Sequence, residues 1–148
     1  MAATMDLQPI MNAEEIADFL DREFPQVNQD GRVYHVQAIG PGSAVLRLEP
    51  THRHLRPGGT LSGPALFTLA DLAAYVVILA HIGPVALAVT TNLNINFLRR
   101  PAPGPLDARC TLLKLGARLA VVDIALVSLA TDDLVAHATS TYSIPPRK

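Results

Sequence analysis

The sequence predicts an α+β fold in which one long central helix packs against an antiparallel sheet, with a shorter helix near the N-terminus. Apolar residues recur at helical spacing over 13–24, and residues 65–82 are apolar nearly all round, as in a buried helix. Most of the other segments alternate with a period of two or are continuously apolar, and Gly, Pro and Asp turns separate them. A single long helix on one face of such a sheet is an α+β layer arrangement.

The composition is that of one folded domain, which we expect to span residues 1–148. With 49% hydrophobic and 17% charged residues the chain is not disordered, and a formal net charge of −1 argues against a nucleic-acid partner. Cys110 is the single cysteine, so no internal disulfide can form. The N-terminus lacks the positively charged region of a secretory signal. We therefore expect a cytoplasmic protein.

Each element has its own start signal. Asn12, followed three residues later by Glu15, is typical of a capping box at the start of the first helix. Ser62 and Pro64 predict the start of the long helix. The expected strands cover residues 32–39, 44–49, 92–97, 106–112, 118–130 and 135–144. Because short loops join the last four strands, we expect them to form an antiparallel meander.

The apolar stretch over 65–82 is about long enough to cross a membrane. However, Asp71 lies inside it, and Gly83 with Pro84 ends it. We interpret the stretch as the buried helix of a soluble protein and expect no membrane partner.

From Pro57 to Leu98, Asp71 is the one charged side chain. Aspartate is a poor residue for a helix interior, and a buried carboxylate is costly unless it is hydrogen-bonded or paired. Thr68, Asp71 and Tyr75 share one helix face as a single polar stripe. Two readings stay open. Asp71 is a satisfied core or solvent-facing residue, or it is a carboxylate in a partly dry cleft, suited to act as a base or nucleophile.

Glycines surround the expected start of the long helix, at Gly58, Gly59 and Gly63. They place free backbone N–H groups near a helix N-terminus, where such groups bind anions or polarise a carbonyl.

These residues resemble a known family. The segments RPGGTLSGPALFTLAD (56–71) and TTNLNINFLRRPA (90–102) are similar to the hotdog-fold acyl-CoA thioesterases, most closely the phenylacetic-acid-pathway type. That family carries N-P-x-G-x-x-H-G-G, followed by a helix with L-A-D. The resemblance implies a long helix wrapped by an antiparallel sheet. It also implies that protomers pair as a homodimer or homotetramer with active sites at their interface.

The resemblance assigns roles to residues of this chain. Asp71 matches the catalytic carboxylate, and Gly63 matches the glycine whose backbone N–H polarises the thioester carbonyl. Thr90 falls near a position where a hydroxyl orients water, and Tyr75 lies where some relatives carry a supporting polar residue.

The chain differs from the family pattern at three positions: the usual Asn is Arg56, the usual His is Ser62, and the second Gly is Pro64. Arg56 is then an electrophilic or water-positioning group, or a cation that contacts the ligand.

The implied ligand carries an anionic nucleotide. Arg99 and Arg100 follow one expected strand, and Lys114 and Arg118 flank a turn, so these four side chains are candidates for its phosphates. The alternative is that they are ordinary solvated charges. Coenzyme A would enter as part of the substrate, and we expect no separate cofactor and no metal.

The predicted function is hydrolysis of a small or medium acyl-CoA thioester, with aromatic acyl groups included. Asp71 would act as general base or nucleophile, and the Gly63 N–H as oxyanion donor. The alternative is a non-catalytic protein of the same fold that binds acyl-CoA or another acyl thioester. A hydratase or dehydratase is disfavoured, because no His accompanies Asp71 on the helix.

Overall fold

The computed structural model describes residues 7–146. Two α-helices and six strands form in the predicted order, with short 3-10 helices at Pro25–Asn28 and His52–His54. The helices are α1 (Ala13–Glu23) and α2 (Gly63–Ile82). The strands are β1 (Tyr34–Gly40), β2 (Ser43–Leu48), β3 (Val89–Phe97), β4 (Leu106–Leu115), β5 (Leu119–Ser128) and β6 (Leu134–Ser143).

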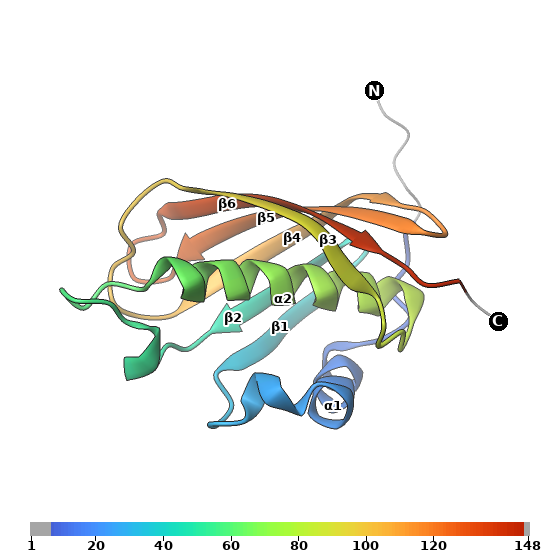
Figure 1. Cartoon of the computed structure of the whole chain (residues 1–148), viewed down its shortest axis with the longest axis horizontal. Coiled ribbons are helices and arrows are strands. Elements are labelled where there is room, and N and C mark those ends of the chain that lie inside the picture. The colour runs from blue at the N-terminus through green and yellow to red at the C-terminus, as the bar shows by residue number, and fades with distance from the viewer. Residues whose placement is uncertain (1–6, 147–148) are drawn as a thin grey trace.

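The six strands form one antiparallel sheet in the order β1-β2-β4-β5-β6-β3. The sheet curls around α2, which runs along its inner face, and α1 lies beyond β1 (Figure 1). The predicted α+β architecture, with a long central helix and a short N-terminal helix, is therefore confirmed.

The expected meander of the last four strands is wrong in one respect. Strands β4, β5 and β6 do follow one another, but β3 pairs with β6 at the far edge of the sheet, and β4 pairs with β2. Alternation along a strand shows which face is buried, but it does not identify the neighbouring strand. The segment 98–105 is long enough to carry the chain across the end of the sheet from β3 to β4 (Figure 1).

The predicted capping box begins α1. The Asn12 side chain accepts from the Glu15 N–H at 2.8 Å, and the Glu15 carboxylate accepts from the Asn12 N–H at 3.0 Å. Helix α1 buries Ile16, Phe19 and Leu20, all at most 3% exposed. Its apolar face thereby packs on the core beside β1.

Helix α2 forms the centre of the core. It is long and apolar enough to cross a membrane, with a mean hydropathy of 2.0 in its most apolar window, but 78% of that window is buried inside the fold. Leu69, Val76 and Ile78 have no exposed surface. Each such buried side chain contributes about 1.5–3 kcal/mol. The surrounding sheet therefore stabilises α2 and holds its polar stripe in place.

Candidate active site

Asp71 lies half-buried in the middle of α2, next to the fully buried Ala70. Its Oδ1 accepts a hydrogen bond from the Thr90 hydroxyl at 2.6 Å. The Tyr142 hydroxyl lies 3.1 Å from the same oxygen and 3.0 Å from the Asp71 carbonyl oxygen. Oδ2 has no hydrogen-bond partner among residues 7–146. The two carboxylate oxygens are thus unequal: one is held, and the other is free to meet a ligand.

The two hydroxyls that hold Asp71 come from neighbouring strands. Thr90 of β3 is paired directly with Tyr142 of β6, and the register shifts just after this pair, between Thr90 and Asn92. Such a bulge re-aims side chains and is common beside functional sites. Burial and the charge of Asp71 both raise the pKa of Tyr142, so its hydroxyl keeps its proton and remains a donor.

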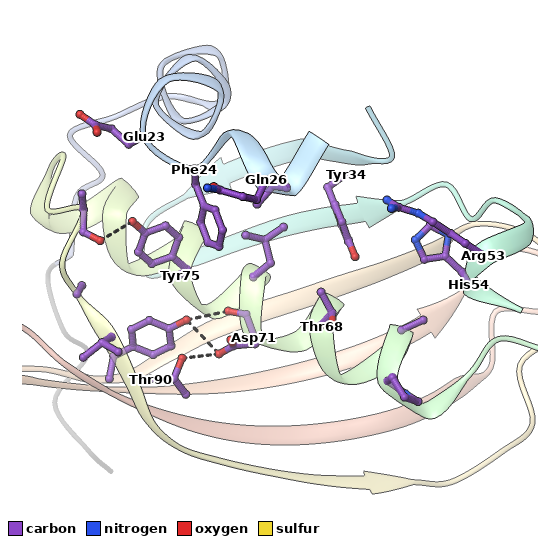
Figure 2. A pocket seen from close by; sticks show the side chains of 18 of the residues that line it. Glu23, Phe24, Gln26, Tyr34, Arg53, His54, Thr68, Asp71, Tyr75 and Thr90 are labelled. Atoms are coloured by element: carbon purple, nitrogen blue, oxygen red, sulfur yellow. Dashed lines mark hydrogen bonds between the residues drawn. The ribbon is translucent and has the colours of Figure 1, made fainter. Parts of the chain in front are cut away.

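A cavity of about 840 Å³ opens over Asp71 (Figure 2). This size is typical of small-molecule sites. The polar stripe predicted on α2 forms part of its wall, because Thr68, Asp71 and Tyr75 all line it. The other walls come from the segment after α1, from β1, from the start of β3 and from Tyr142 of β6.

Aromatic rings make one side of this cavity. Tyr75 stacks on Tyr142 with ring centroids 6.2 Å apart, and Phe24 meets Tyr75 edge-on at 6.1 Å. The Tyr75 hydroxyl donates to the Ala86 carbonyl oxygen at 3.0 Å, away from the Asp71 carboxylate. Tyr75 therefore shapes the cavity with its ring, while its hydroxyl secures the segment before β3.

The start of α2 holds the other predicted residues of the family motif. Ser62 is the N-cap, and its hydroxyl accepts from the Ala65 N–H at 3.2 Å. Gly63 lies against Phe97, since a Cβ placed on this glycine would be 3.6 Å from the Phe97 ring. Gly63 precedes Asp71 by eight positions on the same helix. At a rise of 1.5 Å per residue the two are about 12 Å apart along the axis. Gly63 and Asp71 of one protomer are therefore too far apart to act on one carbonyl.

A second cavity, of about 290 Å³, brings Arg56, Arg99 and Arg100 together. Thr60 and Phe97 also line it. No ion pair within residues 7–146 neutralises these three arginines. The structure thus places Arg56 beside the two arginines that are expected to meet phosphate. Arg56 does not line the Asp71 cavity of the same chain.

Lys114 and Arg118 lie elsewhere, at the turn between β4 and β5. Arg118 donates through Nε to the Ile144 carbonyl oxygen at 3.0 Å, and the Lys114 side chain is exposed. Neither residue lines either cavity.

Sequence reasoning missed Tyr142 as a partner of Asp71. The alternation of β6 places Ala138, Ser140 and Tyr142 on the buried face, which was visible in the sequence. Its position opposite Thr90 depends on the β3–β6 pairing, which the expected meander did not contain.

Comparison with known proteins places the chain in a family. Residues 58–135 match the family model of the thioesterase superfamily, so the chain belongs to this superfamily. As a member it is a thioester hydrolase.

Solved structures agree with this assignment. A protein of Silicibacter sp. TM1040, provisionally described as a thioesterase, is 43% identical over 96% of this chain and 97% of that one, with a TM-score of 0.86. A mutant of the phenylacetic acid degradation protein of Thermus thermophilus is 30% identical over 82% of this chain and 99% of that one, with a TM-score of 0.69. A Streptococcus mutans protein bound to acetyl CoA shares the fold, at 23% identity, 79% and 92% coverage and a TM-score of 0.68.

Proposed function

We propose that the protein hydrolyses the thioester of a small or medium acyl-CoA, with aromatic acyl groups included. Asp71 is the general base or nucleophile, and the backbone N–H of Gly63 is the oxyanion donor. The observation that carries the proposal is the Asp71 carboxylate itself: two hydroxyls hold Oδ1, while Oδ2 has no partner within residues 7–146 and the residue lines a cavity. The aromatic wall of Phe24, Tyr75 and Tyr142 supports an aromatic or apolar acyl group.

Both roles of Asp71 lead to the same products. As a base, its free oxygen takes a proton from water while the water oxygen attacks the thioester carbon. As a nucleophile, that oxygen attacks the carbon directly, and water then hydrolyses the resulting anhydride. In either case the C–S bond breaks, the sulfur leaves as a thiolate that takes up a proton, and a carboxylic acid is released.

The distance between Gly63 and Asp71 favours a site shared by two protomers. Strand β3 forms one edge of the sheet, with Thr90 beside Asp71 near one end and Phe97 beside Gly63 at the other. If the β3 edges of two protomers pair antiparallel, the Gly63 end of one lies toward the Asp71 end of the other. We therefore propose that the active unit is at least a homodimer, in which each site takes Gly63 from the partner.

The arginine cavity is the proposed site for the phosphates of coenzyme A. Arg56, Arg99 and Arg100 provide three guanidinium groups, each able to form paired hydrogen bonds to phosphate oxygens. The Streptococcus mutans neighbour bound to acetyl CoA supports this class of ligand. Lys114 and Arg118 stay secondary candidates, because they lie outside this cavity.

The decisive experiment measures acyl-CoA hydrolysis by the wild type and by Asp71→Ala, with a thiol reagent to follow CoA release. We expect kcat to fall by a factor of about 10² to 10⁴, the usual contribution of a general base. Circular dichroism and the unfolding midpoint verify that the variant is folded. Undiminished hydrolysis by the folded variant would remove Asp71 from the mechanism.

The phosphate site is tested by charge reversal with Arg100→Glu. We expect KM to rise for acyl-CoA and to stay constant for the same acyl group on a short thiol, which has no phosphate to bind. Lys114→Glu is the matched reversal outside the cavity and should have the smaller effect. Equal changes in KM for both thioesters would show that Arg100 does not contact phosphate.

A further inference from the structure

The Asp71 cavity has a second polar region, made by Tyr34 of β1, His54 of the 3-10 helix and Thr68 of α2. In Figure 2, Tyr34 reaches from its strand toward α2, and Thr68 projects from the helix toward the same space. Thr68 precedes Asp71 by about one helical turn, or about 4.5 Å along the axis. This group of Tyr34, His54 and Thr68 is called the oxygen subsite below.

The Tyr34 residue is buried, but its hydroxyl has no protein partner within the described part of the chain and is accessible from the cavity. The residue is only 8% exposed, and its hydroxyl forms no hydrogen bond with any residue in 7–146. Burial raises the pKa of Tyr34, so the hydroxyl keeps its proton. The hydroxyl is not one of the described buried side-chain atoms that lack a partner, so water fills its hydrogen bond when no ligand is bound. Here the hydroxyl faces a cavity, where a ligand can supply the partner.

His54 adds a hydrogen-bond donor whose position on the ring is fixed by the contact of the other ring nitrogen. The residue is 7% exposed, and its Nδ1 accepts from the Thr51 backbone N–H at 2.8 Å. Burial, followed by the charge of Arg53, lowers the pKa of His54, so the ring is neutral at pH 7. A neutral ring that accepts at Nδ1 carries its proton on Nε2. That Nε2–H has no partner among residues 7–146.

The charges nearby favour a neutral ligand group over a carboxylate. Arg53 also lines the cavity, but its guanidinium is paired with Asp30 at 2.7 Å. Glu23 lines the same cavity at the end of α1. Among the residues that line the cavity, no arginine is therefore left unpaired to meet a carboxylate, and Asp71 adds a negative charge. The oxygen subsite itself presents two hydroxyls and one N–H.

We propose that the oxygen subsite binds a neutral hydroxyl or keto oxygen on the acyl group, remote from the thioester, and so makes the protein selective for oxygen-bearing acyl thioesters. This inference rests on the proposed function for the reaction and adds the substrate class. Tyr34 and His54 precede residues 58–135, which match the family model, so most of the subsite comes from outside the matched segment.

The test uses matched pairs of CoA esters, ω-hydroxyhexanoyl with hexanoyl and para-hydroxyphenylpropanoyl with phenylpropanoyl. For at least one pair, the wild type should have the higher kcat/KM toward the hydroxylated member. Tyr34→Phe should lower that preference about tenfold, as expected for the loss of about 1.4 kcal/mol, with little change toward the plain ester. Thr68→Val should lower it in the same direction. Thr139→Val, which alternation places on the outer face of β6, should leave it unchanged.

Stability gives a second readout. Because the Tyr34 hydroxyl has no protein partner, Tyr34→Phe should keep or raise the unfolding midpoint. A preference that survives in both Tyr34→Phe and Thr68→Val would overturn the oxygen subsite.

Calorimetry measures the binding of the same esters to the Asp71→Asn variant, and it separates the oxygen subsite from the proposed hydrolysis. If the wild type hydrolyses none of the esters, the proposed function fails, and this binding then decides the subsite by itself. Tighter binding of the hydroxylated member that is lost with Tyr34→Phe supports the subsite, and equal binding of both members refutes it.

Discussion

Asp71 illustrates how this fold accommodates a charge in the middle of an apolar helix. A buried carboxylate costs several kcal/mol unless hydrogen bonds replace its lost hydration. Thr90 and Tyr142 supply two hydroxyls to Oδ1, and hydrogen bonds to a charged acceptor are the stronger kind. Both donors serve one oxygen, which orients the carboxylate and leaves the other oxygen toward the cavity. At this scale Thr90 and Tyr142 are positioning residues that act through Asp71.

Removing these hydroxyls should therefore slow the reaction with little effect on substrate affinity. We expect Tyr142→Phe and Thr90→Val each to lower kcat about tenfold, as for the loss of about 1.4 kcal/mol of hydrogen bonding. KM should change little, because the cavity keeps its shape. Thr90→Ser restores the hydroxyl and should recover most of kcat. If Thr90→Ser were as slow as Thr90→Val, the Thr90 side chain would act through packing and not through its hydroxyl.

At the scale of elements, α2 is anchored at both ends. Ser62 caps its N-terminus. Near its C-terminus the buried His81 donates through Nδ1 to the Val77 carbonyl oxygen at 2.8 Å, and its Nε2 accepts from the Gly42 N–H at 2.9 Å. The His81 ring thus ties the helix to the turn between β1 and β2. This anchor fixes the C-terminal end of α2 relative to that turn.

The anchor predicts a stability effect at a distance from the site. His81→Leu keeps an apolar side chain but leaves the Gly42 N–H without its partner. We expect the free energy of unfolding to fall by about 1–3 kcal/mol, measured by denaturant titration. His52→Leu, on an exposed side chain, is the control and should change the free energy by less than about 0.5 kcal/mol. A His81→Leu protein as stable as the wild type would show that the bridge contributes nothing.

At the scale of the whole molecule, the sheet ends in an open strand. The outer edge of β3 has no partner strand within residues 7–146, and Val89, Phe97 and Leu98 nearby are each more than half exposed. Open edges with exposed apolar side chains favour pairing with another chain. The proposed β3-to-β3 pairing would give the backbone groups of this edge hydrogen-bond partners. The same pairing would complete the active site.

Shared sites can be tested by complementation. Gly63→Pro removes the oxyanion N–H at the first position of α2, and Ser62 before it already has the extended backbone angles that a residue preceding proline adopts. Gly63→Ala keeps the N–H and makes only ordinary contact with Phe97. We expect Gly63→Pro to lower kcat by about 10² to 10³ and Gly63→Ala to lower it far less.

Mixing Gly63→Pro protomers with Asp71→Asn protomers then distinguishes the two geometries. In a shared site, one site of each mixed dimer is intact, so random exchange restores about one quarter of wild-type activity. Each variant alone stays slow. No recovery after verified exchange would place the whole site within one protomer.

Residue patterns were sufficient for the elements because those depend on local chemistry. The Asn12–Glu15 capping box and the Ser62 cap form as expected, since each requires only residues within one helical turn. Asp71 was singled out by its isolation in an apolar stretch, and its stripe with Thr68 and Tyr75 does line a cavity. The caps and the polar stripe follow from local sequence and helical periodicity, whereas the cavity depends on the rest of the fold.

The partners of Asp71 and the oxygen subsite depend on contacts between distant segments. Tyr142 meets Asp71 because β3 pairs with β6, and the cavity brings Tyr34 and His54 to the same space as Thr68. Arg56 joins Arg99 and Arg100 for a similar reason. By itself the sequence determined the elements, their order and the lone carboxylate, because spacing and hydropathy act locally. Only the tertiary structure decided which strand lies beside which, since many pairings satisfy the same alternation and global packing selects one.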